Sequence, residues 1–225
     1  MRYYPVFLDL VQSRCLVVGA GQVGCRKIAG LLAGNPLEIR VLDSAVPSKE
    51  LQVLLEDSRI HFEQRAFTPA DVSGKKLVFA ATSNRAVNAS VTAACATQGV
   101  LCNCVDAPEE GGFIVPAHLE KGNITVALST AGGSPALSRK IREELDEWLD
   151  GRFEALSELL SRLRPLVLAL RRETGQNTLL FRNVVRSPLA DALRRRDLVQ
   201  SEEQLRLLLP QELHPHIMEL LHDLA

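Results

Sequence analysis

The sequence lacks the two kinds of hydrophobic segment that would direct a chain into or across a membrane. No apolar run among its 225 residues reaches the roughly 18 residues that a membrane-spanning helix needs. The N-terminal stretch MRYYPVFLDL has neither the apolar length nor the cleavage site of a signal peptide. These absences predict a cytoplasmic protein with no membrane partner.

The sequence is also poor in net charge and in paired metal ligands. Its formal charge of −1 at pH 7 gives no overall attraction to nucleic acid. Its five cysteines contain no CxxC pair, so we expect small buried side chains in a reducing compartment. Cys102 and Cys104 share one face of an expected strand, but no second Cys or His pair stands at ligand spacing. No metal site is therefore predicted.

Residues 14–43 carry the pattern around which the rest is organised, a buried strand, a glycine turn, a helix and a second strand. The apolar run Cys15–Val18 is typical of a parallel sheet covered on both faces. A GxGxxG motif follows at Gly19, Gly21 and Gly24. In a dinucleotide site the first glycine permits a tight turn, the second admits a pyrophosphate, and the third lets the helix pack closely.

The residues beside this motif indicate which nucleotide would bind. The first N–H groups of the helix, at Gln22 and Val23, are expected to face a pyrophosphate. Asp43 ends the next strand about 20 residues beyond the motif, at the spacing of a carboxylate that binds ribose hydroxyls, and Ser44 follows it. A carboxylate there repels a 2′-phosphate, which predicts NAD over NADP. Arg40 would weaken that preference.

Three further strands are expected, at residues 60–67, 77–81 and 100–105, with helices between them. This alternation predicts right-handed parallel units and an α/β fold, a doubly wound parallel sheet of Rossmann type. Such sheets bind ligands at the carboxyl ends of their strands. Polar residues occupy the carboxyl ends of two of these strands, at Thr82, Ser83 and Asn84 and at Asn103–Asp106. They should therefore share one crevice with the glycine motif.

The second half of the chain has a different character. Two β-like runs, at residues 113–119 and 123–129, flank a Lys-Gly pair typical of a hairpin. A second glycine-rich loop then leads into a helix with Ser134 as N-cap and Pro135 in its first position, which makes a second candidate anion site. Helical patterns follow, and Pro165 is expected to kink or split one helix. We predict three domains, at 1–112, 113–149 and 150–225.

Several motifs together resemble a known family, the precorrin-2 dehydrogenases, which include the N-terminal module of siroheme synthases. The resemblance runs in order over about residues 3–149 and continues more loosely through the helical remainder. The NxVDAP and STxGxSP elements are much more specific than the glycine motif. The matching stretches are YYPVFLDL, LVVGAGQVGCRKIAGLL, FAATSNRAVNASV, LCNCVDAPEEGGFIVPA and ITVALSTAGGSPALSRKIREEL.

The resemblance implies an NAD-dependent oxidoreductase of tetrapyrrole biosynthesis. Family members oxidise precorrin-2 to sirohydrochlorin with NAD as acceptor, and some also insert a metal, so ferrous or cobaltous ion is a further expected partner. They are typically homodimers with a Rossmann domain, a small α+β dimerisation segment and a C-terminal helical domain. The same organisation is therefore expected here.

The resemblance also implies roles for individual residues. The family's important carboxylate corresponds to Asp106, which would be ionised at neutral pH and can accept a proton. Spacing alone is equally compatible with Asp106 simply opening an Asp-Ala-Pro turn. Thr130, Ser83 and Asn84 depart from the family, which has a serine at the first position and acids at the other two. The carboxylates of the substrate are expected at Ser129, Thr130, Gly133, Ser134, Arg139 and Arg142.

Two alternatives remain open on the sequence. Metal insertion is present in some relatives and absent from others, and the sequence does not discriminate between them. An NAD(H)-binding redox sensor or regulatory domain would explain residues 14–43 equally well, and it predicts nucleotide binding without turnover. Such a sensor would need a basic DNA-reading motif or a membrane partner, and the C-terminal helices show no clear motif of that kind.

Overall fold

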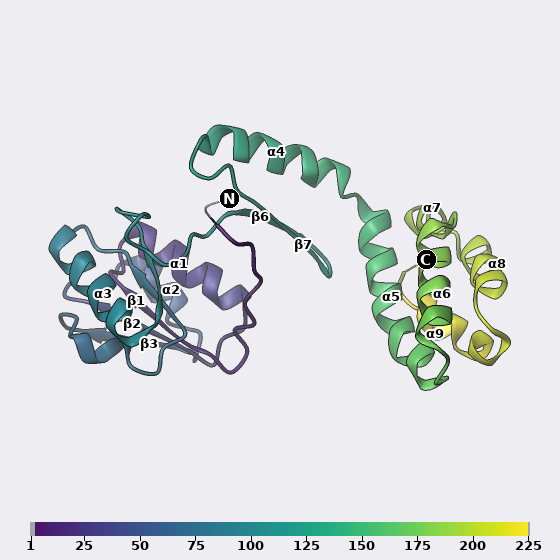
Figure 1. Cartoon of the computed structure of the whole chain (residues 1–225), viewed down its shortest axis with the longest axis horizontal. Coiled ribbons are helices and arrows are strands. Elements are labelled where there is room, and N and C mark those ends of the chain that lie inside the picture. Colours follow the sequence, from purple (N-terminus) through teal and green to yellow (C-terminus); the bar gives the residue numbers. More distant parts are fainter. Residues whose placement is uncertain (1–2, 225) are drawn as a thin grey trace. The chain divides into compact units, whose positions relative to one another are not determined.

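The computed structural model describes residues 3–224 of the chain, which divides into two compact units, Met1–Val115 and Pro116–Ala225 (Figure 1). The first unit contains a five-stranded sheet in the order β3-β2-β1-β4-β5, and every pairing in it is parallel. Its strands are β1 (Arg14–Val18), β2 (Glu38–Asp43), β3 (Ile60–Gln64), β4 (Leu77–Ala80) and β5 (Leu101–Cys104).

Helices cover both faces of this sheet. They are α1 (Gln22–Ala33), α2 (Lys49–Leu54), the short 3₁₀ helix η1 (Pro69–Val72) and α3 (Arg85–Gln98). Val17 of β1 belongs to a buried cluster with Ile28 of α1 and Leu51 of α2, whereas its neighbour Leu16 belongs to a second cluster with Val91 of α3. Because successive strand side chains point to opposite faces, the two clusters lie on opposite sides of the sheet. The predicted doubly wound fold is confirmed.

Local signals set several helix ends in this unit. The Ser48 hydroxyl accepts the Leu51 N–H at 3.2 Å and so caps α2. The Asn84 side chain accepts the Ala86 N–H at 2.9 Å at the start of α3. Gly99, with φ of 67°, ends α3 in the left-handed conformation that favours glycine.

The second unit begins with the predicted hairpin, an antiparallel pair formed by β6 (Ala117–Lys121) and β7 (Ile124–Leu128). The first strand is shorter than expected, because residues 113–116 do not join it. Phe113 instead packs edge-to-face on Phe79 of β4, with 5.5 Å between ring centroids. After the hairpin, the Ser134 hydroxyl caps α4 (Pro135–Trp148), as predicted.

The remaining helices pack around one hydrophobic cluster. They are α5 (Gly151–Ala169), α6 (Thr174–Arg186), α7 (Leu189–Arg194), α8 (Leu198–Leu208), the 3₁₀ helix η2 (Gln211–His216) and α9 (Ile217–Leu221). Pro165 was expected to kink or split a helix. It does not split one, because α5 runs through it as a single helix, and the kink stays a prediction. Leu163 and Val167 on either side are fully buried in the cluster, and their packing outweighs the hydrogen bond that proline cannot make.

No helix within residues 3–224 is long and apolar enough to cross a membrane. The division of the second unit into a segment at 113–149 and a helical domain at 150–225 stays a prediction.

Candidate functional site

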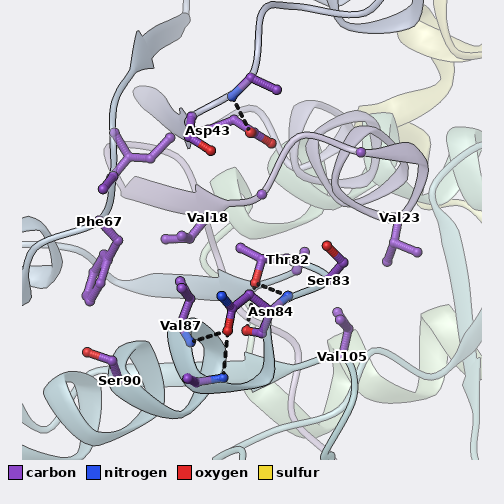
Figure 2. A pocket seen from close by; sticks show the side chains of 18 of the residues that line it. Val18, Val23, Asp43, Phe67, Thr82, Ser83, Asn84, Val87, Ser90 and Val105 are labelled. Carbon is purple, nitrogen blue, oxygen red and sulfur yellow. Dashed lines mark hydrogen bonds between the residues drawn. The ribbon is translucent and has the colours of Figure 1, made fainter.

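A cavity of about 820 Å³ opens at the carboxyl ends of the strands in the first unit (Figure 2). Its walls come from the glycine turn, from the residues that follow β2, β3 and β4, and from the first turns of α3. Its volume suits a small molecule or cofactor. The predicted site residues that line it are Gly19, Gly21, Gln22, Val23, Asp43, Ser44, Thr82 and Ser83.

Each of the three motif positions has its own structural reason to be glycine. Gly19 has φ of 98°, and a β-carbon there would lie 2.6 Å from the backbone of Ala81 and Thr82. A β-carbon on Gly24 would lie 2.0 Å from the carbonyl oxygen of Gly19, so this position holds α1 close against the turn. Around Gly21, by contrast, there is nothing within 4 Å of such an atom. Gly21 therefore keeps open the space that a pyrophosphate would occupy.

Asp43 joins the end of β2 to the glycine turn. One carboxylate oxygen accepts the Ala20 N–H at 2.6 Å, and the other accepts the Ala45 N–H at 2.9 Å. These bonds fix the side chain at the cavity wall. Each carboxylate oxygen can accept more than one hydrogen bond, so acceptor capacity remains for ribose hydroxyls.

The loop after β3 forms a further part of the cavity wall, which the sequence did not predict. The expected strand at residues 60–67 ends at Gln64, and Arg65 and Phe67 line the cavity instead. The Arg65 guanidinium is bound by Asp71 at 2.7 and 2.8 Å and by Glu63 at 2.7 Å, which compensates its charge. The position of this loop after a strand was the only signal for it. Asn84, expected in the crevice together with Thr82 and Ser83, lines the cavity too. Val87 and Ser90 were not predicted; all three are labelled in Figure 2.

Asp106 lies two residues beyond β5 and directly follows Val105, which lines the cavity. Its side chain is 33% exposed. Its Oδ1 accepts hydrogen bonds from Nδ2 of Asn88 at 2.9 Å and from the Cys104 thiol at 3.2 Å, and the Arg85 Nε lies 3.9 Å from Oδ2. Burial opposes ionisation, but these hydrogen bonds and the Arg85 charge hold the pKa of Asp106 below its usual value. The carboxylate is therefore ionised at neutral pH.

Two predicted cofactor-binding residues lie outside the cavity wall. Gly24 is buried beneath the turn, in the packing role described above. Asn103 is buried in β5, and its Nδ2 donates to the Phe113 carbonyl at 3.0 Å. This bond ties the segment after β5 back to the sheet, so the side chain supports the fold around the site.

The predicted substrate loop lies in the second unit and forms a hydrogen-bonded turn. The Ser129 hydroxyl accepts the Ala131 N–H at 3.1 Å. The Thr130 hydroxyl accepts the Ser134 N–H at 3.3 Å and lies 3.1 Å from the Ser138 hydroxyl. The hydroxyl that Thr130 retains in place of the family serine thus organises the start of α4.

The remaining predicted substrate residues belong to the same loop and helix. The Gly133 N–H donates to the Thr130 carbonyl at 2.9 Å. Arg139 is exposed and pairs with Glu143 at 3.3 Å, one turn further along α4, while Arg142 is half-buried. No group of three or more His, Cys, Asp or Glu side chains suited to a metal occurs among residues 3–224.

Comparison with known proteins agrees with this geometry. Residues 6–117 match the family model described as "Putative NAD(P)-binding". Siroheme synthase 1 of Yersinia enterocolitica is 35% identical over 207 residues, which are 92% of this chain and 43% of that protein. Siroheme synthase of Methylococcus capsulatus is 36% identical over 167 residues, which are 74% of this chain and 35% of that protein. The chain thus spans less than half the length of these two relatives.

A solved structure extends the likeness to the whole fold. The protein titled "SirC, precorrin-2 dehydrogenase" aligns with a TM-score of 0.73 and 25% identity, over 92% of this chain and 98% of that one. The glycine turn, Asp43 and the matching family model make the first unit an NAD-binding domain. With the sequence relatives and this structural match, the chain belongs to the precorrin-2 dehydrogenase and siroheme synthase family.

Proposed function

We propose that the protein oxidises precorrin-2 to sirohydrochlorin with NAD as acceptor. The observation that carries the proposal is the ionised carboxylate of Asp106, which adjoins the NAD cavity through Val105. A group that accepts a proton beside a redox cofactor is what this dehydrogenation requires. The likeness to a protein titled precorrin-2 dehydrogenase, over nearly the whole of both chains, supports the substrate.

Different residues of the chain bind the nucleotide and accept the proton in this reaction. When bound, NAD supplies the two-electron acceptor. Asp43 and the open backbone at Gly21 hold and orient the nucleotide at the carboxyl edge of the sheet. Asp106 takes up the proton that leaves the substrate as the electron pair is removed, and it later releases that proton to solvent through its exposed side.

An anaerobic assay with precorrin-2 and NAD, following sirohydrochlorin by absorbance, tests the proposal. Wild-type protein should form sirohydrochlorin only when NAD is present. Asp106→Asn should lower turnover by roughly 100-fold or more, as expected for loss of a proton acceptor, with NAD affinity unchanged. Glu109→Gln is the matched control, because Glu109 is an exposed carboxylate of the same loop and should leave turnover unaffected. Equal rates for Asp106→Asn and wild type would refute the role of Asp106.

The redox-sensor hypothesis gives the opposite result in the same assay. A sensor would bind NAD at the glycine turn and leave precorrin-2 unchanged. Nucleotide binding measured by calorimetry, together with no sirohydrochlorin, would therefore overturn the proposed enzyme.

We further propose that the substrate loop binds the carboxylates of precorrin-2. Its support is the hydroxyl-rich turn ahead of α4 and the two arginines that follow it. Arg142→Gln should raise KM for precorrin-2 several-fold and leave NAD affinity unchanged. Arg164→Gln, an exposed position on α5, serves as the control for loss of a positive charge. Equal KM values for the two variants would refute this assignment.

Metal insertion and the homodimer remain proposals drawn from the family. Ferrous or cobaltous ion would be a substrate held by the macrocycle nitrogens, with Asp106 as acceptor of the pyrrole protons. Adding each ion to purified sirohydrochlorin, with and without wild-type protein, tests this. Faster formation of the metal complex of sirohydrochlorin in the presence of the protein would support insertion. Light scattering of the purified chain tests the dimer, and fractionation of cells tests the predicted cytoplasmic location.

A further inference from the structure

Asn88 is a polar side chain at the centre of an otherwise apolar helix face. It lies in α3, one turn before Val91 and Thr92, and is fully buried. An amide without partners at such a depth costs several kcal/mol, so each of its polar atoms must find a bond. The hydrogen-bond partners of Asn88 should therefore explain why an asparagine occupies this buried position.

The Asn88 amide uses its full bonding capacity on two neighbours. Its Nδ2 donates to the Thr82 carbonyl at 3.0 Å and to Asp106 Oδ1 at 2.9 Å. Its Oδ1 accepts the Thr82 N–H at 3.1 Å and the Thr82 hydroxyl at 2.7 Å. The orientation of the amide follows from these bonds, because the Thr82 N–H requires an acceptor where the oxygen stands. Thr82 lines the NAD cavity, so Asn88 bridges that cavity wall and Asp106.

The two oxygens of Asp106 are held unequally. Oδ1 receives both hydrogen bonds, from Asn88 and from the Cys104 thiol. Oδ2 lies 3.9 Å from Nε of Arg85, and that guanidinium is itself paired with Glu110. Fixing one oxygen with two donors sets the rotation of the carboxylate and leaves Oδ2 as its more basic atom.

We propose that Asn88 is a positioning residue, which couples the NAD-binding loop at Thr82 to Asp106 and presents Oδ2 to the substrate as the proton acceptor. The inference rests on the proposed dehydrogenase function. It adds the atom that reacts, Oδ2 of Asp106, and the residue that orients it, Asn88. Asn88 acts through Asp106 and Thr82 and itself touches neither substrate nor cofactor. Its loss should therefore change the proton step more than nucleotide affinity.

The test compares Asn88→Asp with Thr92→Val in the full-length protein. Asn88→Asp keeps the shape and the acceptor for Thr82 but removes both donated bonds. Thr92→Val removes a partly buried hydrogen bond to the Asn88 carbonyl, on the same helix, without touching Asp106. We expect kcat to fall roughly 10- to 100-fold in Asn88→Asp, with KM for NAD within about threefold of wild type. Thr92→Val should keep kcat within about threefold of wild type.

A pH profile separates positioning from a purely structural role. Asn88→Asp should move the acidic limb of kcat up by roughly one pH unit, because Asp106 loses a donor and gains a like-charged neighbour. Cys104→Ala removes the other donor to Oδ1 and should move the limb in the same direction. If Asn88→Asp fails to fold, Asn88→Ala, which also lacks a donor to Asp106, carries the test. The charged group beside Asp106, Arg85, and its own partner Glu110 are unchanged in these variants. A limb that stays in place in the folded Asn88 variant would overturn the proposal.

A measurement without substrate keeps this result apart from the proposed function. Carbon-13 NMR of aspartate-labelled protein, with the Asp106 signal assigned by its loss in Asp106→Asn, reports the pKa directly. A higher Asp106 pKa in Asn88→Asp and Cys104→Ala than in Thr92→Val supports the coupling. Equal pKa values in an active enzyme refute the positioning role alone. Wild-type protein that leaves precorrin-2 intact refutes the proposed function, and the catalytic meaning of the coupling with it.

Discussion

The ion pair between Asp71 and Arg65 should make the stability of the first unit depend on pH. Asp71 is 8% exposed and accepts two hydrogen bonds from Arg65 and two from Thr68. Bonding to Arg65, opposed by burial, lowers the pKa of Asp71 to about 2 from the ordinary 3.8. That difference corresponds to about 2 kcal/mol of folding free energy at neutral pH.

The sign of the effect follows from the direction of the pKa change. The pKa is lower in the folded protein than in the unfolded chain, so the stabilisation is fully present above about pH 4. It is lost as the pH falls from there toward about 2. Asp71→Asn should therefore lower the free energy of unfolding by about 2 kcal/mol near pH 7, and by clearly less near pH 3.

Hydrogen exchange of the β1 and β4 amides measures this quantity, because those strands form the centre of the sheet and open only when the unit unfolds. Asp57→Asn is the matched control. The pKa of Asp57 is also lowered to about 2, by hydrogen bonds from Arg59, but this pair is more exposed and solvent screens it. Asp71→Asn should be the more destabilising of the two. Equal losses near pH 7 and pH 3, or a larger loss in Asp57→Asn, would refute the reasoning.

Further predictions concern the glycine turn and the helical unit. Gly24→Ala should destabilise the first unit severely, because the added methyl group would lie 2.0 Å from the Gly19 carbonyl oxygen. Gly21→Ala places a methyl group in open space, so it should keep the melting temperature of wild type but weaken NAD binding in calorimetry. Leu163→Ala in α5 should cost about 2–5 kcal/mol in urea denaturation, since the side chain is fully buried. Pro165→Ala should raise the melting temperature of the helical unit, because it restores a helix hydrogen bond; an unchanged or lower value would show that the ring itself is needed.

Much of the first unit could be predicted because its signals are local. The spacing of Gly19, Gly21 and Gly24 states a backbone requirement, and the structure places steric limits at the first and third of these positions. The run Cys15–Val18 is apolar at every position because both faces of β1 are covered. Asp43 was found by its distance along the chain from the motif, and it lines the cavity.

Other features could not be predicted because tertiary contacts determine them. Arg65 and Phe67 enter the cavity wall because β3 stops early, and alternation of side chains does not show where a strand ends. The continuity of α5 through Pro165 depends on packing against other helices. Asn88 carries no motif of its own, and its importance appears only when α3, Thr82 and Asp106 are seen together.

The bond from Asp43 to the Ala20 N–H has a consequence for changing the cofactor preference by design. Removing the carboxylate to admit a 2′-phosphate would also remove one of the acceptors that join β2 to the glycine turn. The Ala20 N–H, in a largely buried residue, would lose its partner, and Ala45 would lose one as well. An NADP-dependent version of this fold therefore needs two changes, a cation for the phosphate and a neutral acceptor that keeps the turn closed.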